Sequence, residues 1–323
     1  MKTRSLNSIH RIITKMVAAS LVLTGLSFQS VASAQEDEPI KIGVLQLVQH
    51  EALDAVLKGF TETLDASDYA DRIEWDIQNA HGDQASLQSI SEKIARDNEI
   101  LFAIATPAAQ ALATAETKKP IFIAAVTDPV EAGLADSLEE PGGNVTGTSD
   151  MAPIAEQVDL LVRNFPEVKN VGIIYNSSEV NSLVQAEQAA AALEAVGLNP
   201  IISTVTSTND IAQNMTSLVE QVDAMFMVTD NTIDSSIALV GDIAKEAGIP
   251  TIGSSDSVVL TNGLATLSSS YEEYGIQTAE MVIRMLDEGL SASDLPIELA
   301  KEFKIIVNPE FAEAIGIDPD SIK

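Results

Sequence analysis

Short apolar runs alternate with longer amphipathic segments along the chain from Ile40 onward. The apolar runs have the length of strands and are bounded by polar or turn-forming residues. The strands that they predict are 40–47, 72–80, 100–106, 120–127, 144–149, 170–176, 200–205, 224–230 and 251–255. The amphipathic segments predict helices over 50–64, 85–98, 108–117, 154–165, 180–197, 209–222 and 232–248. Strands that are apolar on both faces belong to parallel sheets covered by helices on both sides, so the pattern predicts an α/β protein.

One unit of this pattern occurs twice. Residues 41–60 and 171–190 are each a strand, a polar break and a helix, and each begins a series of further strand–helix pairs. Between the two series lies PGGNVTGTSDMAP (141–153), whose Gly, Pro and Thr residues are typical of a linker. One more strand end and a helix over 268–289, and a last strand or two with a short helix over 296–317, complete the pattern. A chain of 323 residues is long for a single core. The sequence therefore predicts two doubly wound parallel-sheet lobes joined by a hinge.

Polar residues follow the predicted strands. The run IFIAAV ends in Thr127-Asp128-Pro129, and AMFMV ends in Thr229-Asp230. Ligands of open parallel sheets collect at the carboxyl ends of the strands, so these residues are expected to form two polar rims. The candidates from the rims are Gln49, His50, Thr106, Thr127 and Asp128 in the first lobe and Tyr175, Asn176, Ser177, Asp230, Asn231, Ser254 and Asp256 in the second.

Some of these candidates have other interpretations. Asp128, Asn176 and Asp230 are equally suited to capping helices. His50 is also compatible with a solvated loop. In Thr106-Pro107-Ala108, the hydroxyl and the free N–H groups at a helix start can hold a carboxylate or another anion.

The first 34 residues have the pattern of a signal peptide. Basic residues are followed by the apolar stretch 16–28 and by Ala32-Ser33-Ala34, which suits cleavage after Ala34. The apolar stretch is short for a membrane span, although an uncleaved anchor is the alternative. Export to the periplasm is the simplest expectation.

Charge and composition exclude several classes of function. The formal net charge is −30, and removal of residues 1–34 leaves 14 basic against 48 acidic residues, or −34. Phosphate repulsion then makes nucleic acid an implausible partner. The chain contains no cysteine, which removes disulfides, thiolate chemistry and a lipid-modified N-terminal cysteine.

Signatures of enzymes are missing as well. The sequence has no G-x-G-x-x-G after a strand, no Walker loop and no G-x-S-x-G motif. Only two of the three histidines lie beyond the signal peptide. The sequence therefore predicts no enzyme, no cofactor and no metal site.

Four segments resemble a known family. KIGVLQLVQHEALDAVLKGF (41–60), IFIAAVTDPVEAGL (121–134) with PGGNVTGTSD (141–150), VGIIYNSSEVNS (171–182) and GIPTIGSSDSVVLTNGLATLSSSYEEYG (248–275) are similar to ABC-transporter substrate-binding proteins, a family that includes tryptophan-binding members. The likeness covers essentially the whole chain after the signal peptide and implies the type I periplasmic binding protein fold. It implies three crossings between the lobes, with 35–149 and 268–299 in lobe one and 150–267 and 300–323 in lobe two.

The resemblance also implies a ligand and roles for the rim residues. An aromatic amino acid is the implied solute, bound by hinge closure of a monomer and delivered to a membrane permease and its ATPase. Thr106, Ala108 and Thr127 would hold the ligand's carboxylate and Asp256 its ammonium group. Asn176, Ser177 and Asp230 would complete a polar ring, with Gln49 and His50 near the side chain. The candidates for an aromatic wall are Tyr175, Phe226, Tyr271 and Tyr274.

Two alternatives remain at this stage. A sensory receptor of the same fold would signal through a partner in place of feeding a transporter. A secreted hydrolase would use Asp128 or Asp256. The sequence does not choose among aromatic and branched aliphatic amino acids, and it leaves a purine or a sugar open.

Overall fold

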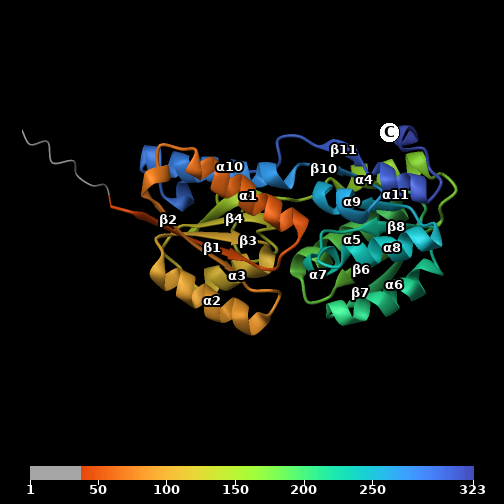
Figure 1. Ribbon diagram of the computed structural model, residues 1–323, viewed down its shortest axis with the longest axis horizontal. Coiled ribbons are helices and arrows are strands. Elements are labelled where there is room, and N and C mark those ends of the chain that lie inside the picture. Colours follow the sequence, from red (N-terminus) through yellow and green to blue (C-terminus); the bar gives the residue numbers. More distant parts are fainter. Residues whose placement is uncertain (1–37) are drawn as a thin grey trace, which may run out of the picture. The chain divides into compact units, whose positions relative to one another are not determined.

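The computed structural model describes residues 38–323, which form two α/β lobes, each built on its own sheet (Figure 1). The predicted signal peptide over 1–34 lies outside the described residues. Among residues 38–323, no helix has both the length and the apolar character needed to cross a membrane.

The first lobe is a five-stranded sheet in the order β2-β1-β3-β4-β5, with every neighbouring pair parallel. Its strands are β1 (Ile40–Gln46), β2 (Ile73–Asn79), β3 (Ile100–Ile104), β4 (Ile121–Val126) and β5 (Val145–Ser149). Its helices are α1 (Glu51–Asp65), α2 (Gln84–Asp97), α3 (Thr106–Ala115) and α10 (Tyr271–Glu288). Helices α1 and α10 cover one face of the sheet, and α2 and α3 cover the other (Figure 1).

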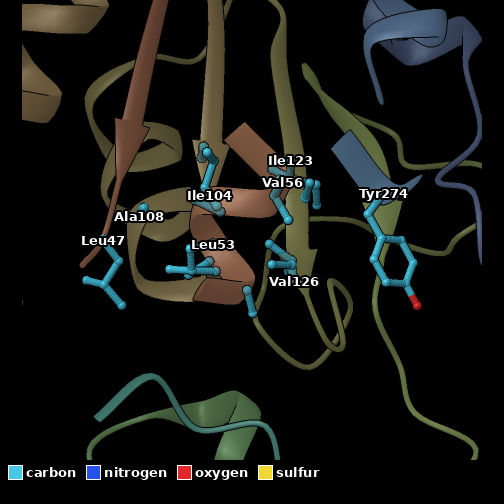
Figure 2. Packing of buried hydrophobic residues seen from close by; sticks show 14 of the residues in the cluster. Leu47, Leu53, Val56, Ile104, Ala108, Ile123, Val126 and Tyr274 are labelled. Atoms are coloured by element: carbon cyan, nitrogen blue, oxygen red, sulfur yellow. The ribbon is translucent and has the colours of Figure 1, made fainter. Parts of the chain in front are cut away.

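The core of this lobe explains its apolar strands. Every residue of β3 and β4 is buried, because these strands lie inside the sheet and are covered on both faces. Figure 2 shows Leu53 and Val56 of α1 beside Ile104 and Val126 at the ends of these strands. The edge strand β2 is only half-buried, which accounts for its alternation of charged and apolar residues.

The second lobe is a six-stranded sheet in the order β11-β10-β9-β8-β6-β7. Its strands are β6 (Asn170–Asn176), β7 (Asn199–Val205), β8 (Ala224–Met227), β9 (Thr251–Gly253), β10 (Ala265–Ser268) and β11 (Lys304–Val307). Its helices are α4 (Ile154–Asn164), α5 (Val180–Ala195), α6 (Ile211–Val219), α7 (Asn231–Asp234), α8 (Ile237–Ala247), α9 (Asp256–Asn262) and α11 (Pro309–Ala314). Strand β11 runs antiparallel to β10, so the sheet is not wholly parallel as predicted.

The chain passes between the two sheets three times. It leaves the first sheet after β5, and it returns from β10 to helix α10, which packs against α1. It leaves again after Glu298, whose carbonyl oxygen accepts a hydrogen bond from Ser149 N–H at 2.9 Å, and enters β11.

One predicted helix differs in the structure. The segment 232–248 contains two helices, α7 and α8, separated by Ser235 and Ser236. Ser236 has φ −115° and ψ 17°, which lies outside the helical region, so the chain turns between the two helices. The short helix α9, which follows β9, was not predicted either.

Two glycines bring helices α1 and α10 into close contact. A Cβ atom at Gly59 would overlap the carbonyl oxygen of Glu272, and one at Gly275 would overlap that of Val56. This close crossing fixes the start of α1, which follows His50, relative to the start of α10 at Tyr271.

Candidate functional site

Strained backbone lies at the ends of three of the strands that end at the predicted rims, directly after β3 and β9 and in the last residues of β4. Ala105, Ala125 and Ser254 have φ angles of 84°, 54° and 58°, and all three are buried. The left-handed region costs a residue with a side chain about 1–3 kcal/mol, and such residues cluster at ligand sites. The strained residues therefore indicate that the ends of β3, β4 and β9 belong to a ligand site.

Residues from both sheets enclose one small cavity at these strand ends, which we call the inner cavity. Its lining residues are His50, Leu53, Ala125, Thr127, Asp150, Asn181, Thr229, Asp230, Asn231, Asp234 and Tyr271. The volume is about 10 Å³, enough for about one water molecule. In the described conformation, an amino acid does not fit inside it.

A wider opening adjoins the inner cavity at Asn231, and we call it the outer cleft. Its volume is about 350 Å³, within the range of small-molecule sites. It is lined by Leu47, Val48, His81, Gly82, Gln84 and Pro107 from the first lobe and by Asn176, Ser178, Glu179, Thr206, Ser207, Thr208, Asn231, Thr232 and Ser235 from the second.

A buried polar contact joins the two rims directly. Thr127 Oγ1 and Thr229 Oγ1 lie 3.4 Å apart. Gln185 of α5 donates from Nε2 to both hydroxyls, and its Oε1 accepts from Thr229 N–H at 2.9 Å. These three side chains are almost fully buried, so the first and second sheets meet through a network without solvent.

Unpartnered polar atoms are concentrated at the inner cavity. Within residues 38–323, seven buried side-chain nitrogen and oxygen atoms lack a hydrogen-bond partner. Four of them belong to cavity-lining residues, namely both ring nitrogens of His50, Oδ1 of Asp150 and Oδ1 of Asn181. Buried polar groups in proteins are nearly always bonded, so this concentration marks the cavity as a place built to receive polar groups.

His50 supplies a neutral imidazole. Burial lowers the pKa of His50 to about 4, against smaller opposing effects of the neighbouring Asn231 and Asp54. The ring is therefore uncharged near neutral pH.

Carboxylates supply the only formal charge on the cavity wall. Burial, together with the charge of Glu179, raises the pKa of Asp230 to about 7, and burial raises the pKa of Asp234 well above its usual range. Burial also raises the pKa of Asp150, whose Oδ2 accepts a hydrogen bond from the Tyr271 hydroxyl. The described residues contain no group of three or more His, Asp or Glu side chains arranged to bind a metal ion.

The structure brings six of the predicted residues to the inner cavity, namely His50, Thr127, Thr229, Asp230, Asn231 and Tyr271. Asn176 lines the outer cleft, where its Nδ2 donates to Thr232 Oγ1 at 2.8 Å. Ser254 is buried behind the cavity and donates from its hydroxyl to Asp234 Oδ1 at 3.2 Å.

Two predicted residues lie at the start of helix α3. Thr106 is only 1% exposed, and its Oγ1 has no hydrogen-bond partner. Ala108 is buried two residues further along the same helix. Neither lines the inner cavity, but Ala105 N–H bonds to the carbonyl oxygen of Ala124, so Thr106 lies beside the strand end that carries Ala125 and Thr127.

Five more of the predicted residues line neither opening and make other contacts in the described conformation. Tyr175 belongs to the same buried apolar cluster as Phe226. Asp128 caps a turn by accepting from the N–H groups of Val130 and Glu131, both at 3.0 Å. Gln49 and Ser177 are exposed.

Asp256, the fifth, lies at the first position of α9. Its Oδ1 accepts from Tyr271 N–H at 3.4 Å, and burial raises its pKa. Its carboxylate therefore bonds to the backbone at the start of α10 and does not line the inner cavity.

Several residues at the cavity were missed in the sequence. Asp150 follows Ser149 at the end of β5, the same pattern of a hydroxyl residue and an aspartate that marks Thr127-Asp128 and Thr229-Asp230. Asp234 follows Asp230 by one helical turn. These two sequence patterns could have identified Asp150 and Asp234 as site residues. Leu53 and Asn181 have no local sequence feature that distinguishes them from other helix residues.

Two α/β lobes that enclose a polar cavity at the carboxyl ends of their strands define a solute-binding protein of the two-lobed type. The chain belongs to the family of ABC transporter substrate-binding proteins, because that family's profile matches residues 41–322. The expected resemblance and the fold of two α/β lobes are thereby confirmed. The relatives are substrate-binding proteins and not enzymes, so the prediction of no enzyme is also confirmed.

Three relatives are especially similar. A tyrosine-binding protein of Clostridioides difficile is 38% identical over 288 residues, covering 87% of this chain and 83% of the relative. An ABC domain from Streptococcus pneumonia, solved in complex with L-Trp, is 36% identical with a TM-score of 0.81. A ligand-free, open substrate-binding protein with adhesive properties from Clostridium difficile is 39% identical with a TM-score of 0.67. Both solved structures cover 86% of this chain, and this chain covers 95% of each.

Proposed function

We propose that this chain is the extracytoplasmic solute-binding component of an ABC importer and that it binds an amino acid with an aromatic side chain. The observation that carries the proposal is the concentration of unpartnered, buried polar atoms at a cavity shared by both lobes. Relatives that bind tyrosine and L-Trp support the choice of solute.

Helix α3 is suited to the ligand's carboxylate. Its first turn presents backbone N–H groups, and the unpartnered hydroxyl of Thr106 adds a donor in the same place. The main chain at Ala108 and the hydroxyl of Thr127 complete the set that we assign to the carboxylate. The ring of Tyr271, which lines the inner cavity and meets Tyr274 edge-on at 5.4 Å, offers an aromatic wall.

Binding requires the lobes to open and close. A cavity of about 10 Å³ cannot admit a solute without separation of the rims. The described conformation is more similar to the L-Trp complex than to the ligand-free open relative, at TM-scores of 0.81 and 0.67 and at nearly equal identity. This difference supports a closed state here and an open state that admits the ligand.

The family and the sequence before residue 38 support a proposal for the location and the partners. We assign residues 1–34 to a cleaved signal peptide, the site of action to the periplasm, and the receiving partners to a permease and its ATPase. The segments 35–149 with 268–299 and 150–267 with 300–323 are proposed as the two moving lobes of a monomer.

A binding screen tests the proposal. The protein from Gln35 onward is heated with each of the twenty amino acids, with nucleosides and with simple sugars, and hits are measured by calorimetry. We expect tyrosine, tryptophan or phenylalanine to raise the Tm, because a ligand of the native state stabilises it by mass action. A hit should also lower the radius of gyration in X-ray scattering. A shift caused only by sugars or nucleosides would refute the amino-acid assignment.

Transport needs its own test, because a sensory receptor would bind the same ligand. In liposomes that contain the permease and ATPase of the same genome, the liganded protein should stimulate ATP hydrolysis. Tight binding without stimulation would favour the sensory role.

A further inference from the structure

Four buried carboxylates surround the inner cavity or its wall: Asp150, Glu179, Asp230 and Asp234, each no more than 6% exposed. Of the described residues, no lysine or arginine lines the cavity, and His50 is neutral near pH 7. Burying a carboxylate that has no partner costs free energy. The hydrogen bonds of each carboxylate therefore show which of the four still has an oxygen without a donor.

Two of the four are fully occupied by hydrogen-bond donors. Asp230 accepts from Ile233 N–H at 2.8 Å with Oδ1 and from Asn176 N–H at 2.6 Å with Oδ2. Glu179 accepts from Asn231 with one oxygen and from Thr232 with the other. These carboxylates hold the loops of the second lobe together and have no oxygen to spare for a ligand.

Asp234 and Asp150 differ in what they offer. The Ser254 hydroxyl lies between both oxygens of Asp234, at 3.2 and 3.4 Å. Asp150 Oδ2 accepts from the Tyr271 hydroxyl, whereas its Oδ1 has no partner. Asp150 is the first residue after β5, where the chain first leaves the first sheet, so its carboxylate stands between the two lobes.

We propose that Asp150 binds the ammonium group of the ligand through its free oxygen, and that the site thereby selects solutes carrying a positively charged amine. This inference rests on the proposed function and assigns the ammonium group to Asp150 in place of Asp256. Tyr271 orients the carboxylate through Oδ2 and leaves Oδ1 directed to the ligand.

The physical reason is charge balance inside a closed cavity. An ammonium group brings both the missing hydrogen-bond donor and the opposite charge, and a bond between two charged groups is about twice as strong as a neutral one. An analogue that lacks the amine leaves Asp150 buried and unpaired when the lobes close, so the closed complex is penalised. The preference for an amine therefore has two sources: the hydrogen bond to Asp150 and the cost of closing the lobes over an unpaired carboxylate.

The experiment compares L-tyrosine with 3-(4-hydroxyphenyl)propionate, which has the same ring and carboxylate and no amine. L-tryptophan and indole-3-propionate form a second matched pair. Calorimetry with the wild-type protein should give an affinity about 100-fold higher for the amino acid of the tighter-binding pair. In Asp150→Asn, which keeps an acceptor for the Tyr271 hydroxyl, this ratio should fall about 30-fold or more. The matched control Asp256→Asn should keep the wild-type ratio.

The outcomes separate the inference from the function on which it rests. If the amino acid and its amine-free analogue bind equally well to the wild-type protein, the inference is wrong and amino-acid binding stands. A ratio that falls in Asp256→Asn and not in Asp150→Asn moves the ammonium site to Asp256. If neither amino acid binds in the first place, the proposed function itself fails. Should Asp150→Asn not fold, Asp150→Ser replaces it in the same comparison.

Discussion

The hydroxyl of Thr106 offers a test in which stability and binding change in opposite directions. Thr106→Val keeps the shape of the side chain and removes only the ability to form hydrogen bonds. In the described conformation Thr106 is 1% exposed and its hydroxyl has no partner. The folded state therefore bears the cost of burying it, about 1–3 kcal/mol for a buried polar group without a bond. Its removal should raise the free energy of unfolding by about 1 kcal/mol or more.

Binding should respond in the other direction. If Thr106 donates to the ligand's carboxylate, the variant loses a hydrogen bond to a charged group, which contributes about 1.5–3 kcal/mol. This corresponds to a loss of affinity of about 10- to 150-fold. Urea denaturation of the ligand-free protein measures the first quantity, and calorimetry with L-tyrosine or L-tryptophan measures the second.

Thr146→Val is the matched control. Thr146 is also fully buried, but its hydroxyl donates to the carbonyl oxygen of Leu295 at 2.9 Å and it lies at the start of β5, away from the strand ends. That variant should lose stability and keep the wild-type affinity. Unchanged binding by Thr106→Val would refute the carboxylate assignment, and a clear loss of its stability would show that the hydroxyl has a partner in the free protein.

Three further changes test the fold and the site. Gly59→Ala should lower the free energy of unfolding by about 2 kcal/mol or more in urea titrations, because the added methyl group meets the backbone of α10, whereas Gly143→Ala, with open space around it, should be neutral. His50 is protonated less readily in the folded than in the unfolded protein, since its pKa is about 4 against an ordinary 6.5. Its contribution to stability is therefore present above pH 6.5 and lost as the pH falls to 4, by about 3 kcal/mol. The stability of the wild type relative to His50→Gln should fall by this amount between pH 6.5 and 4, and parallel curves would exclude this effect. Thr229→Val breaks the contact with Thr127 that joins the lobes, so ligand affinity should fall about fivefold. X-ray scattering should also show a larger ligand-free molecule. An unchanged radius of gyration would argue against a role of this contact in closure.

Much of the fold could be predicted because its strands are buried on both faces. The strands β3 and β4 are continuous apolar runs, and a turn or a helix start follows each, so their positions follow from local pattern. Helices α7 and α8 were predicted as one because the two serines between them are compatible with a helix and only the path of the chain separates them. Helix α9 is short, and its seven residues hold too little periodicity to identify.

The sequence predicted what kind of site the protein has, but only some of the residues that line it. Hydroxyl and carboxyl residues at strand ends indicated the rims, and Thr127, Asp230 and Asn231 do meet at the inner cavity. Tyr175 shows the limit of that reasoning. It also lies near the end of a strand, but its ring joins the apolar cluster of the second lobe, and a sequence does not state which face of a two-sided strand meets the ligand.

The sequence by itself determined that this chain is an α/β protein with two lobes, without cysteine chemistry and with polar residues where its strands end. These properties depend on periodicity and composition, which act over a few residues at a time. Only the tertiary structure decided which polar residues share a cavity and which of their atoms lack a partner. Asp150 and Tyr271 are 121 residues apart in the chain, yet they share a hydrogen bond. That bond exists because the chain passes between the lobes three times and the glycine contact of α1 with α10 holds Tyr271 in place.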